Sequence, residues 1–368
     1  MKTTIFQTAA LDMAGQYGRL SLEGLGLSDY AHRYVSDYRS NPDALAANWL
    51  RSAHIIATAL RHADAEPSST CLIDCGGGQG LLSLLAVRLG FGQVVYSDLG
   101  AQMTCDAQAI GQRMGMLATH YVAGDLSAVA RALHHDRSST YIVVSSNVIE
   151  HVYDLNDLWD ACTELAADRR FTAVWCSDAN SANPFISSRR RRTHRFFENI
   201  DRTASNRDSE LDSTSSFASL RRRLIEPLLP EKSCHELDRL TAATRGLHAA
   251  DIQTAVRQFL QDGRLVQPEH PTNTCNPETG NWCERLIDLN ATRSQLQGRG
   301  WQVHVEPGFY GPRSGLARQA AVSLLNRAIA LASPHSLAIA PVYQLVMSLP
   351  RQPAPMTNQR IPDRLNSA

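Results

Sequence analysis

Lysine is almost absent from this sequence, which has only Lys2 and Lys232 among its 36 basic residues. Arginine carries the positive charge, a bias that points to a GC-rich bacterial genome more than to a mechanism. The 36 acidic residues balance that charge, so the chain lacks the net charge that would favour nucleic acid or an anionic membrane as a partner.

A disulfide framework and a membrane segment are missing as well. The eight cysteines form no CxxC pair, and Cys71, Cys105, Cys162 and Cys176 lie in apolar segments, which favours reduced thiols. No apolar run is long enough to span a bilayer, and the N-terminus has no long apolar h-region. We therefore expect a cytoplasmic protein without a membrane partner, and nothing in the sequence bears on its oligomeric state.

A glycine-rich turn between two predicted strands is the most informative feature. A short apolar run at 71–73 predicts a buried strand, and the glycine cluster Gly76–Gly80 follows it. An apolar helix is predicted from residue 81 to a stop at Gly90. A second strand at 93–96 then brings Asp98 to its C-terminal end. Strand, glycine turn, helix, strand and acid form the first half of a nucleotide-binding α/β sheet.

The spacing of the glycines narrows the choice of nucleotide. Asp98 follows Gly80 by 18 residues, close to the distance of about 20 residues that presents a carboxylate to a ribose diol. The nicotinamide fingerprint would require a glycine at Leu81 or Ser83, and no P-loop lysine follows the turn. The pattern that is present reads Asp-x-Gly-x-Gly-x-Gly over 74–80.

This pattern resembles motif I of the class I S-adenosylmethionine (SAM)-dependent methyltransferases. The resemblance implies that the glycine turn lies under the amino-acid end of SAM and that Asp98 holds the ribose hydroxyls. A second segment, Ser146–Val152, follows a predicted fourth strand at 141–145. It resembles the stretch after strand four of the family, a hydrophobic pair followed by Glu-His.

The resemblance implies SAM as cofactor and a binding site built from several loops at one edge of the sheet. The residues expected to form it are Asp74, Cys75, Gly76, Gly77, Gly78, Gly80, Asp98, Leu99, Met103, Asp125, Leu126, Asn147 and Val148. Asp125 follows a predicted third strand at 120–123 and resembles the acid that bonds the adenine amino group. Its alternative role is to cap the next helix.

The alternation continues through further strands at 171–176, 301–305 and 336–347. It predicts an α/β fold, a seven-stranded Rossmann-like methyltransferase sheet with a mostly helical insertion after strand five. The expected parts are a helical lid or extension (1–64), a SAM-binding core (65–184), an acceptor-binding cap (185–268), an acceptor loop with the end of the sheet (269–350) and a flexible tail (351–368).

The Glu150-His151 pair is the first candidate for chemistry beyond cofactor binding. A histidine can act as general base when the methyl acceptor is a hydroxyl, whereas in this family the same position often only lines the cofactor pocket. Some relatives hold Mg²⁺ with Glu-His and a glutamate three residues earlier. Asn147 occupies that position here and is a poor ligand for a hard cation, so we expect no metal.

The polar segment His270–Trp282 is the second candidate. It is dense in hydrogen-bonding side chains and follows the insertion directly, which favours an acceptor site, although an ordered surface loop has the same composition. His270 is therefore an alternative catalytic base. We expect Asn183, His270, Asn273 and Trp282 to contact the acceptor.

Two arginine runs, 189–192 and 221–223, lie inside the insertion. Such runs usually form a solvated helix face, and the functional alternative is a clamp for an anionic group of the acceptor. The sequence thus predicts a SAM-dependent methyltransferase that methylates an oxygen of a polar small molecule, with nucleic acid an unlikely partner. N-methylation, intramolecular alkyl transfer or cyclisation, and non-catalytic SAM binding are the alternatives.

Overall fold

The computed structural model describes residues 2–134, 136, 138, 140–167, 169–202, 214–229, 234–332 and 335–349. The predicted tail at 351–368 lies outside these residues. Within them, no helix combines the length and the apolar character needed to cross a lipid bilayer.

A seven-stranded sheet forms the centre of the protein, in the order β3-β2-β1-β4-β5-β7-β6. The strands are β1 Cys71–Cys75, β2 Gln93–Asp98, β3 His120–Ala123, β4 Thr140–Ser146, β5 Arg170–Ser177, β6 Gln302–Pro307 and β7 Tyr343–Leu349. Only β7 runs antiparallel to its neighbours β5 and β6. This is the strand order of the class I methyltransferase sheet, so the predicted fold class is confirmed.

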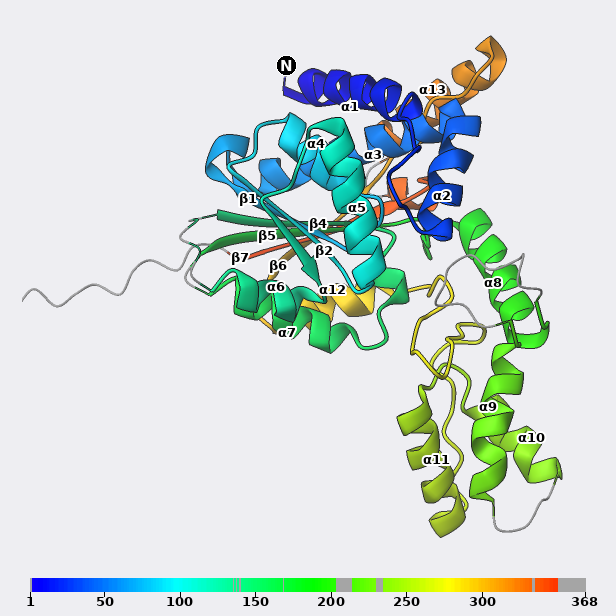
Figure 1. Cartoon of the computed structure of the whole chain (residues 1–368). Helices are drawn as coiled ribbons and strands as arrows, with labels where there is room; N and C mark the ends of the chain where they lie inside the picture. Colours follow the sequence, from blue (N-terminus) through cyan, green and yellow to red (C-terminus); the bar gives the residue numbers. More distant parts are fainter. Residues whose placement is uncertain are drawn as a thin grey trace, which may run out of the picture.

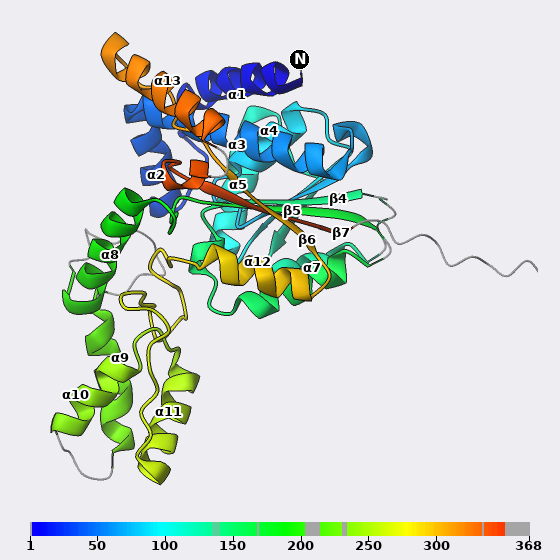
Figure 2. The ribbon, with the colours of Figure 1, turned by 180° about the vertical axis from the view of Figure 1, so that it is seen from behind.

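Helices cover both faces of the sheet (Figures 1 and 2). The helices of the N-terminal part and the core are α1 Lys2–Gly18, α2 Asp29–Ser40, α3 Pro42–Ala63, α4 Leu81–Arg88, α5 Ala101–Met114, α6 Leu126–Ala132, α7 Leu155–Leu165, α12 Leu289–Gly298 and α13 Leu316–Leu331. The strand pleat divides the core: Leu72 packs with α3, α4 and α5, whereas Cys71 and Ile73 pack with α6 and α7 on the other face.

The N-terminal segment adds α1 to α3 to one face. Asn41 caps α3 by accepting a hydrogen bond from the Ala44 amide, and Pro42 occupies the first turn. Trp49 and Ile56 of α3 are fully buried in the cluster that includes strand residues of β4 and β5. Helix α3 thus packs against the sheet as part of the hydrophobic core. A lid function of residues 1–64 stays a prediction.

The insertion after β5 consists of α8 Pro184–Asn199, α9 Phe217–Ile225, α10 Cys234–Ala243 and α11 Ala249–Asp262. It forms an arm that projects away from the sheet (Figure 1). The far part of the arm has an apolar cluster of its own, with Ile225, Leu240 and Ile252 at its centre. Only the start of α8 and the segment that returns to α12 lie at the sheet, so the insertion covers the sheet edge only at its root.

The predicted seventh strand began too early. Residues 335–338 form a short 3₁₀ helix, and β7 begins at Tyr343. The apolar residues Leu337 and Ala340 before the strand made the run look continuous. Ala340 is buried outside the strand, where its carbonyl accepts hydrogen bonds from the side chains of Asn180 and Asn183.

An ion pair between α3 and β6 gives a test of how the N-terminal helices are held. Glu306 accepts hydrogen bonds from Arg61 (2.5 Å) and contacts the His62 ring at 2.7 Å. The contact with His62, reinforced by Arg61 and opposed by burial, lowers the pKa of Glu306 from 4.5 to about 2. A carboxylate whose pKa is lower in the folded state stabilises the protein fully above the unfolded pKa and loses this effect as pH falls toward the folded pKa.

We therefore expect Glu306→Gln to reduce the free energy of unfolding by about 1–2 kcal/mol at pH 7. The difference from wild type should shrink as pH falls from 4.5 toward 2, measured by urea unfolding. Glu164→Gln, at an exposed position of α7, serves as control and should change little. A loss that does not depend on pH would contradict this role of Glu306.

Candidate functional site

The order of the strands reverses between β1 and β4: β2 and β3 are added on one side of β1, and β4 and β5 on the other. The residues that follow β1 and β4 lie together at this point. β1 pairs with β2 on one side and with β4 on the other, which makes this edge the switch point where α/β sheets bind ligands. Gly76 follows β1 and Val148 follows β4. A Cβ atom at Gly76 would lie 2.4 Å from Cγ2 of Val148, so only glycine permits this approach.

The glycine turn is shaped by positive φ angles and by Asp98. Gly76, Gly78 and Gly80 have φ values of +67°, +52° and +78°. The Gly78 amide donates to one carboxylate oxygen of Asp98 (3.1 Å), and the Gly100 amide donates to the other (3.0 Å). Asp98 is thus bonded directly to the glycine turn, while its contact with the ribose of a cofactor stays a prediction. A Cβ at Gly78 would meet no protein atom within 4 Å, so the turn is open on that side.

Asp74 lies beneath the turn and is fully buried. Its Oδ2 accepts hydrogen bonds from the amide (3.0 Å) and the hydroxyl (2.8 Å) of Ser83, at the start of α4, while its Oδ1 has no hydrogen-bond partner. Burial raises the pKa of Asp74 to about 7, against the lowering effect of Ser83. Oδ2 of Asp74 therefore fixes the start of α4, and Oδ1 is left without a hydrogen-bond donor.

The remaining predicted cofactor residues fall at the same edge with different exposure. Leu99 is 75% exposed, whereas Leu126 is buried in the core and Cys75 is nearly so. Asp125 caps α6 by accepting a hydrogen bond from the Ala128 amide (2.9 Å), which is the alternative that the sequence left open. Met103 accepts a hydrogen bond from Gln79 at 3.5 Å. Their contacts with a cofactor stay predictions.

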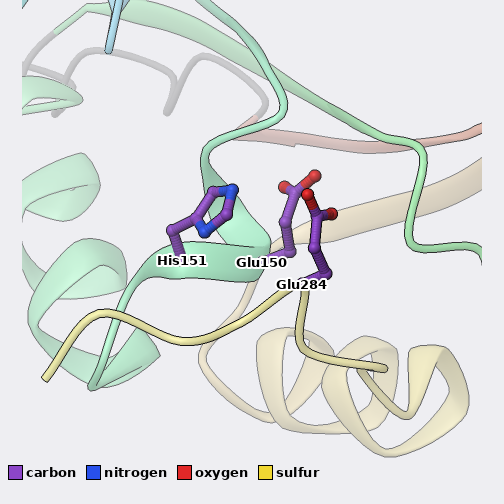
Figure 3. A group of neighbouring side chains, drawn as sticks. All are labelled: Glu150, His151 and Glu284. Atoms are coloured by element: carbon purple, nitrogen blue, oxygen red, sulfur yellow. The ribbon is translucent and has the colours of Figure 1, made fainter. Parts of the chain in front are cut away.

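Glu150 and His151 lie in a 3₁₀ turn after β4 and meet Glu284, which comes from the segment behind the insertion (Figure 3). Ligand-type atoms of the three side chains lie within 4.8 Å of one another. Glu150 is fully buried, and neither of its carboxylate oxygens has a hydrogen-bond partner. Burial raises the pKa of Glu150 to about 7; His151 opposes the shift, and Glu284 and Asp178 add to it.

Backbone hydrogen bonds attach the returning segment to the Glu150-His151 turn. The Trp282 amide donates to the His151 carbonyl (3.2 Å), and the Arg285 amide donates to the Glu150 carbonyl (3.1 Å). Nδ1 of His151 lies 2.8 Å from the Trp282 carbonyl, which can only accept, so Nδ1 carries the proton. In the neutral ring, Nε2 then presents its lone pair.

His270 has the opposite arrangement. Its Nδ1 accepts hydrogen bonds from the amides of Thr272 (3.1 Å) and Asn273 (3.0 Å). Burial and three nearby arginines lower the pKa of His270, which favours the neutral ring with its proton on Nε2. The lone pair of His270 is therefore engaged with the backbone.

The other predicted acceptor residues have structural partners as well. Asn183 caps α8 through Oδ1 and donates to the Ala340 carbonyl. Asn273 exchanges two hydrogen bonds of 3.1 Å with the Leu286 backbone, and the Trp282 indole donates to the Tyr153 carbonyl (3.2 Å). All three side chains are buried, and their contact with an acceptor stays a prediction.

The arginine runs, for which a solvated helix face and an anion clamp were left open, are only partly exposed. Arg190 pairs with Asp178 and, at 3.3 Å, with Glu284. Arg221 is fully buried and pairs with Glu198. The exposed Arg191 and Arg192, with Arg195 one turn further along α8, line a hollow on this helix together with Pro184, Ser187 and Ser188.

Glu284 was not predicted from the sequence, and Arg190 was considered only as part of the run 189–192. Glu284 lies 134 residues after Glu150 in a loop, and no local pattern marks it. Arg190 could have been found: the buried residues of α8 are Ser187, His194 and Phe197, and Arg190 falls on the same helical face.

Comparison with known proteins supports the class of this domain. Residues 73–180 match the family model described as methyltransferase domain. No curated protein sequence matches the chain significantly.

Solved structures give weak likenesses. A SAM-dependent methyltransferase from Mesorhizobium loti is 15% identical over 79% of this chain and 96% of its own, with a TM-score of 0.35. One from Clostridium acetobutylicum is 14% identical over 49% of this chain and 64% of its own, with a TM-score of 0.33. A proposed RNA methyltransferase from Pyrococcus horikoshii is 16% identical over 41% and 65%, with a TM-score of 0.27. The chain thus spans less than two thirds of two of these relatives.

The family match and the strand order together define the class of the domain that contains residues 73–180. The chain carries a class I, Rossmann-like SAM-dependent methyltransferase domain, an enzyme domain whose cofactor is SAM. The residues present fit that cofactor, because the turn is open at Gly78, Asp98 is not buried and Asp74 has an unsatisfied buried oxygen.

The open side of Gly78 gives the sharpest test of the cofactor position. Alanine there should weaken SAM binding about tenfold or more, because its methyl group enters space that the cofactor needs. Gly90 is a matched control: its φ is +74° and a Cβ there also meets nothing within 4 Å, but it follows α4 at its far end. Both variants should lose about 1 kcal/mol of stability from backbone strain. Calorimetric titration showing equal SAM affinity for the two would place the cofactor elsewhere.

A second test removes the carboxylate of Asp98. Asp98→Ala should lower SAM affinity roughly tenfold or more, since a lost hydrogen bond to a charged group costs about 1.5–3 kcal/mol. Asp125→Ala distinguishes a cofactor contact from helix capping. It removes the α6 cap and, if Asp125 only caps the helix, leaves SAM affinity unchanged. Unaltered SAM affinity of Asp98→Ala would refute the ribose role.

Proposed function

We propose that the protein transfers the methyl group of SAM to a hydroxyl oxygen of a polar small molecule, and that His151 activates this hydroxyl. The observation that carries the proposal is the bond from Nδ1 of His151 to the Trp282 carbonyl, which leaves Nε2 as a proton acceptor beside a buried carboxylate. A hydroxyl is a weak nucleophile, and a group that removes its proton raises the rate of transfer.

The cofactor site is proposed to hold SAM as follows. When bound, SAM supplies a methyl carbon, and the electron pair of the broken C–S bond stays on sulfur. Asp98 accepts hydrogen bonds from the ribose hydroxyls with lone pairs not used by Gly78 and Gly100. Oδ1 of Asp74 and the open glycine turn receive the amino-acid end.

The acceptor is proposed to lie between the turn after β4 and the returning segment 272–287. Val148 contacts the glycine turn, and Glu150 and His151 follow it directly, so this turn links the cofactor edge to the Glu150-His151-Glu284 cluster. The acceptor oxygen approaches the methyl carbon while its proton passes to Nε2 of His151. Holding both partners at one edge supplies much of the rate.

Hydrogen bonding favours His151 over His270 as the activating residue. Nε2 of His151 presents a lone pair, whereas the lone pair of His270 accepts two backbone amides. His270 is assigned the role of fixing the loop that starts at Pro271.

The two histidines can be separated by kinetics. His151→Ala should lower turnover by about 10²–10⁴ and leave SAM affinity within about twofold, because it removes activation of the acceptor and no cofactor contact. His270→Ala should keep turnover within about tenfold, the effect of a less rigid loop. Radiolabelled methyl transfer to a panel of hydroxylated metabolites measures turnover, and calorimetry measures SAM affinity. If His151→Ala retains the wild-type rate, the acceptor is activated by another group or is a nitrogen nucleophile.

A further inference from the structure

The Glu150 carboxylate is an ionisable group in an environment that does not suit its charge. It is fully buried, and neither oxygen has a hydrogen-bond partner. Burying a carboxylate without a partner is expensive, and proteins satisfy such groups with a proton, a donor or a metal ion. A structural role would have provided a donor, as Ser83 does for Asp74.

Two further carboxylates near Glu150 add negative charge that also needs a positive partner. Glu284 and Asp178 add two more carboxylates, and Arg190 pairs with both. One guanidinium thus faces three carboxylates, and the cluster has a formal charge of −2 when all are ionised and His151 is neutral. A divalent cation matches this charge.

His151 is oriented as a metal ligand would be. Nδ1 donates to the Trp282 carbonyl at 2.8 Å, and the ring points Nε2 toward the paired carboxylates (Figure 3). A ligating histidine typically donates its other ring nitrogen to a carbonyl or carboxylate, which fixes the tautomer and the ring. The Trp282 carbonyl has this role here, and it belongs to the same segment that brings Glu284.

We propose that Glu150, His151 and Glu284 bind a divalent transition-metal ion. Their ligand atoms lie within 4.8 Å of one another, and this is the one such group of histidine, cysteine or acidic residues among the residues described. Atoms bound to one ion at about 2.0–2.2 Å lie roughly 3–4.4 Å apart, so small side-chain rotations close the site. One imidazole with two carboxylates suits Mn²⁺, Fe²⁺ or Zn²⁺ better than Mg²⁺.

This inference rests on the proposed function and refines it. Three protein ligands leave coordination positions open for an acceptor hydroxyl. An ion held by Glu150, His151 and Glu284 would lower the pKa of a hydroxyl bound to it, which makes the loss of the hydroxyl proton easier. In the absence of the ion, Nε2 of His151 takes the proton as proposed above; with the ion bound, the same lone pair would hold the ion instead.

The site also revises the expectation that Asn147 excludes a metal. That expectation considered only the position three residues before Glu150. Asn147 has a φ of +57°, and its Oδ1 accepts a hydrogen bond from the Asp178 amide, so it shapes the turn. The third ligand is supplied by Glu284 from a segment that the insertion separates from Glu150.

Titration of the chelator-treated full-length protein with MnCl₂ tests the site without SAM or acceptor. We expect one Mn²⁺ per chain by calorimetry and by loss of the free-ion signal in electron paramagnetic resonance. Glu150→Gln and Glu284→Gln should each weaken Mn²⁺ binding at least tenfold. Glu164→Gln, an exposed acid of α7, should bind like wild type. Equal Mn²⁺ affinity in all four proteins, or no binding to the wild type, would overturn the proposal.

Two further measurements keep the test decisive. If Glu284→Gln unfolds, Glu284→Asn tolerates the left-handed φ of +50° at this position and replaces it. A saturating Mn²⁺ concentration should raise the melting temperature of the wild type but not of Glu150→Gln, because only the native state holds the ligands together. A rise of the same size in both proteins would contradict the site.

Failure of the metal site and failure of the proposed function give different results. Hydroxyl methylation that continues at full rate after the chelator, with no Mn²⁺ bound, keeps the function and refutes the site. Stoichiometric Mn²⁺ binding that Glu150→Gln abolishes, together with methylation of amines only, keeps the site and refutes the choice of acceptor.

Discussion

The attachment of the returning segment to the turn after β4 is the contact on which the candidate site depends. Two backbone hydrogen bonds, from Trp282 to His151 and from Arg285 to Glu150, hold it. They orient the His151 ring through the Trp282 carbonyl and place Glu284 beside Glu150. The chain leaves the sheet after β5, forms the helical arm and returns in this segment. The site is therefore completed by residues that are remote in sequence from the cofactor motif.

The cofactor half of the site could be predicted because its determinants are local. Gly76, Gly78 and Gly80 follow a buried strand, and the acid that meets them ends the next strand, so one stretch of sequence contains the geometry. The third strand at 120–123 was predicted with the bounds that the structure has. The early start of the seventh strand shows the limit of an apolar pattern, because residues buried in a turn look like residues buried in a strand.

The acceptor half could not be predicted in the same way, because its contacts join distant positions. Glu284 and Arg190 gain meaning only when α8 and the returning segment meet at the sheet edge. The position of the proton on each histidine ring also cannot be predicted from the sequence. The sequence offers His151 and His270 as alternative bases, whereas the backbone groups around each ring assign opposite tautomers to the two. Asn183, Asn273 and Trp282 were chosen for their polar groups, and the structure uses those groups to hold the loop.

We expect the methyl group to be delivered beside His151, Glu150 and Glu284. A crystal structure of the full chain with S-adenosylhomocysteine tests it most directly. The claim predicts that the ribose lies on Asp98 and that the thioether sulfur faces the His151 ring with room for a single acceptor hydroxyl between them. A sulfur that faces away from this cluster, toward the exposed side of Leu99, would contradict it.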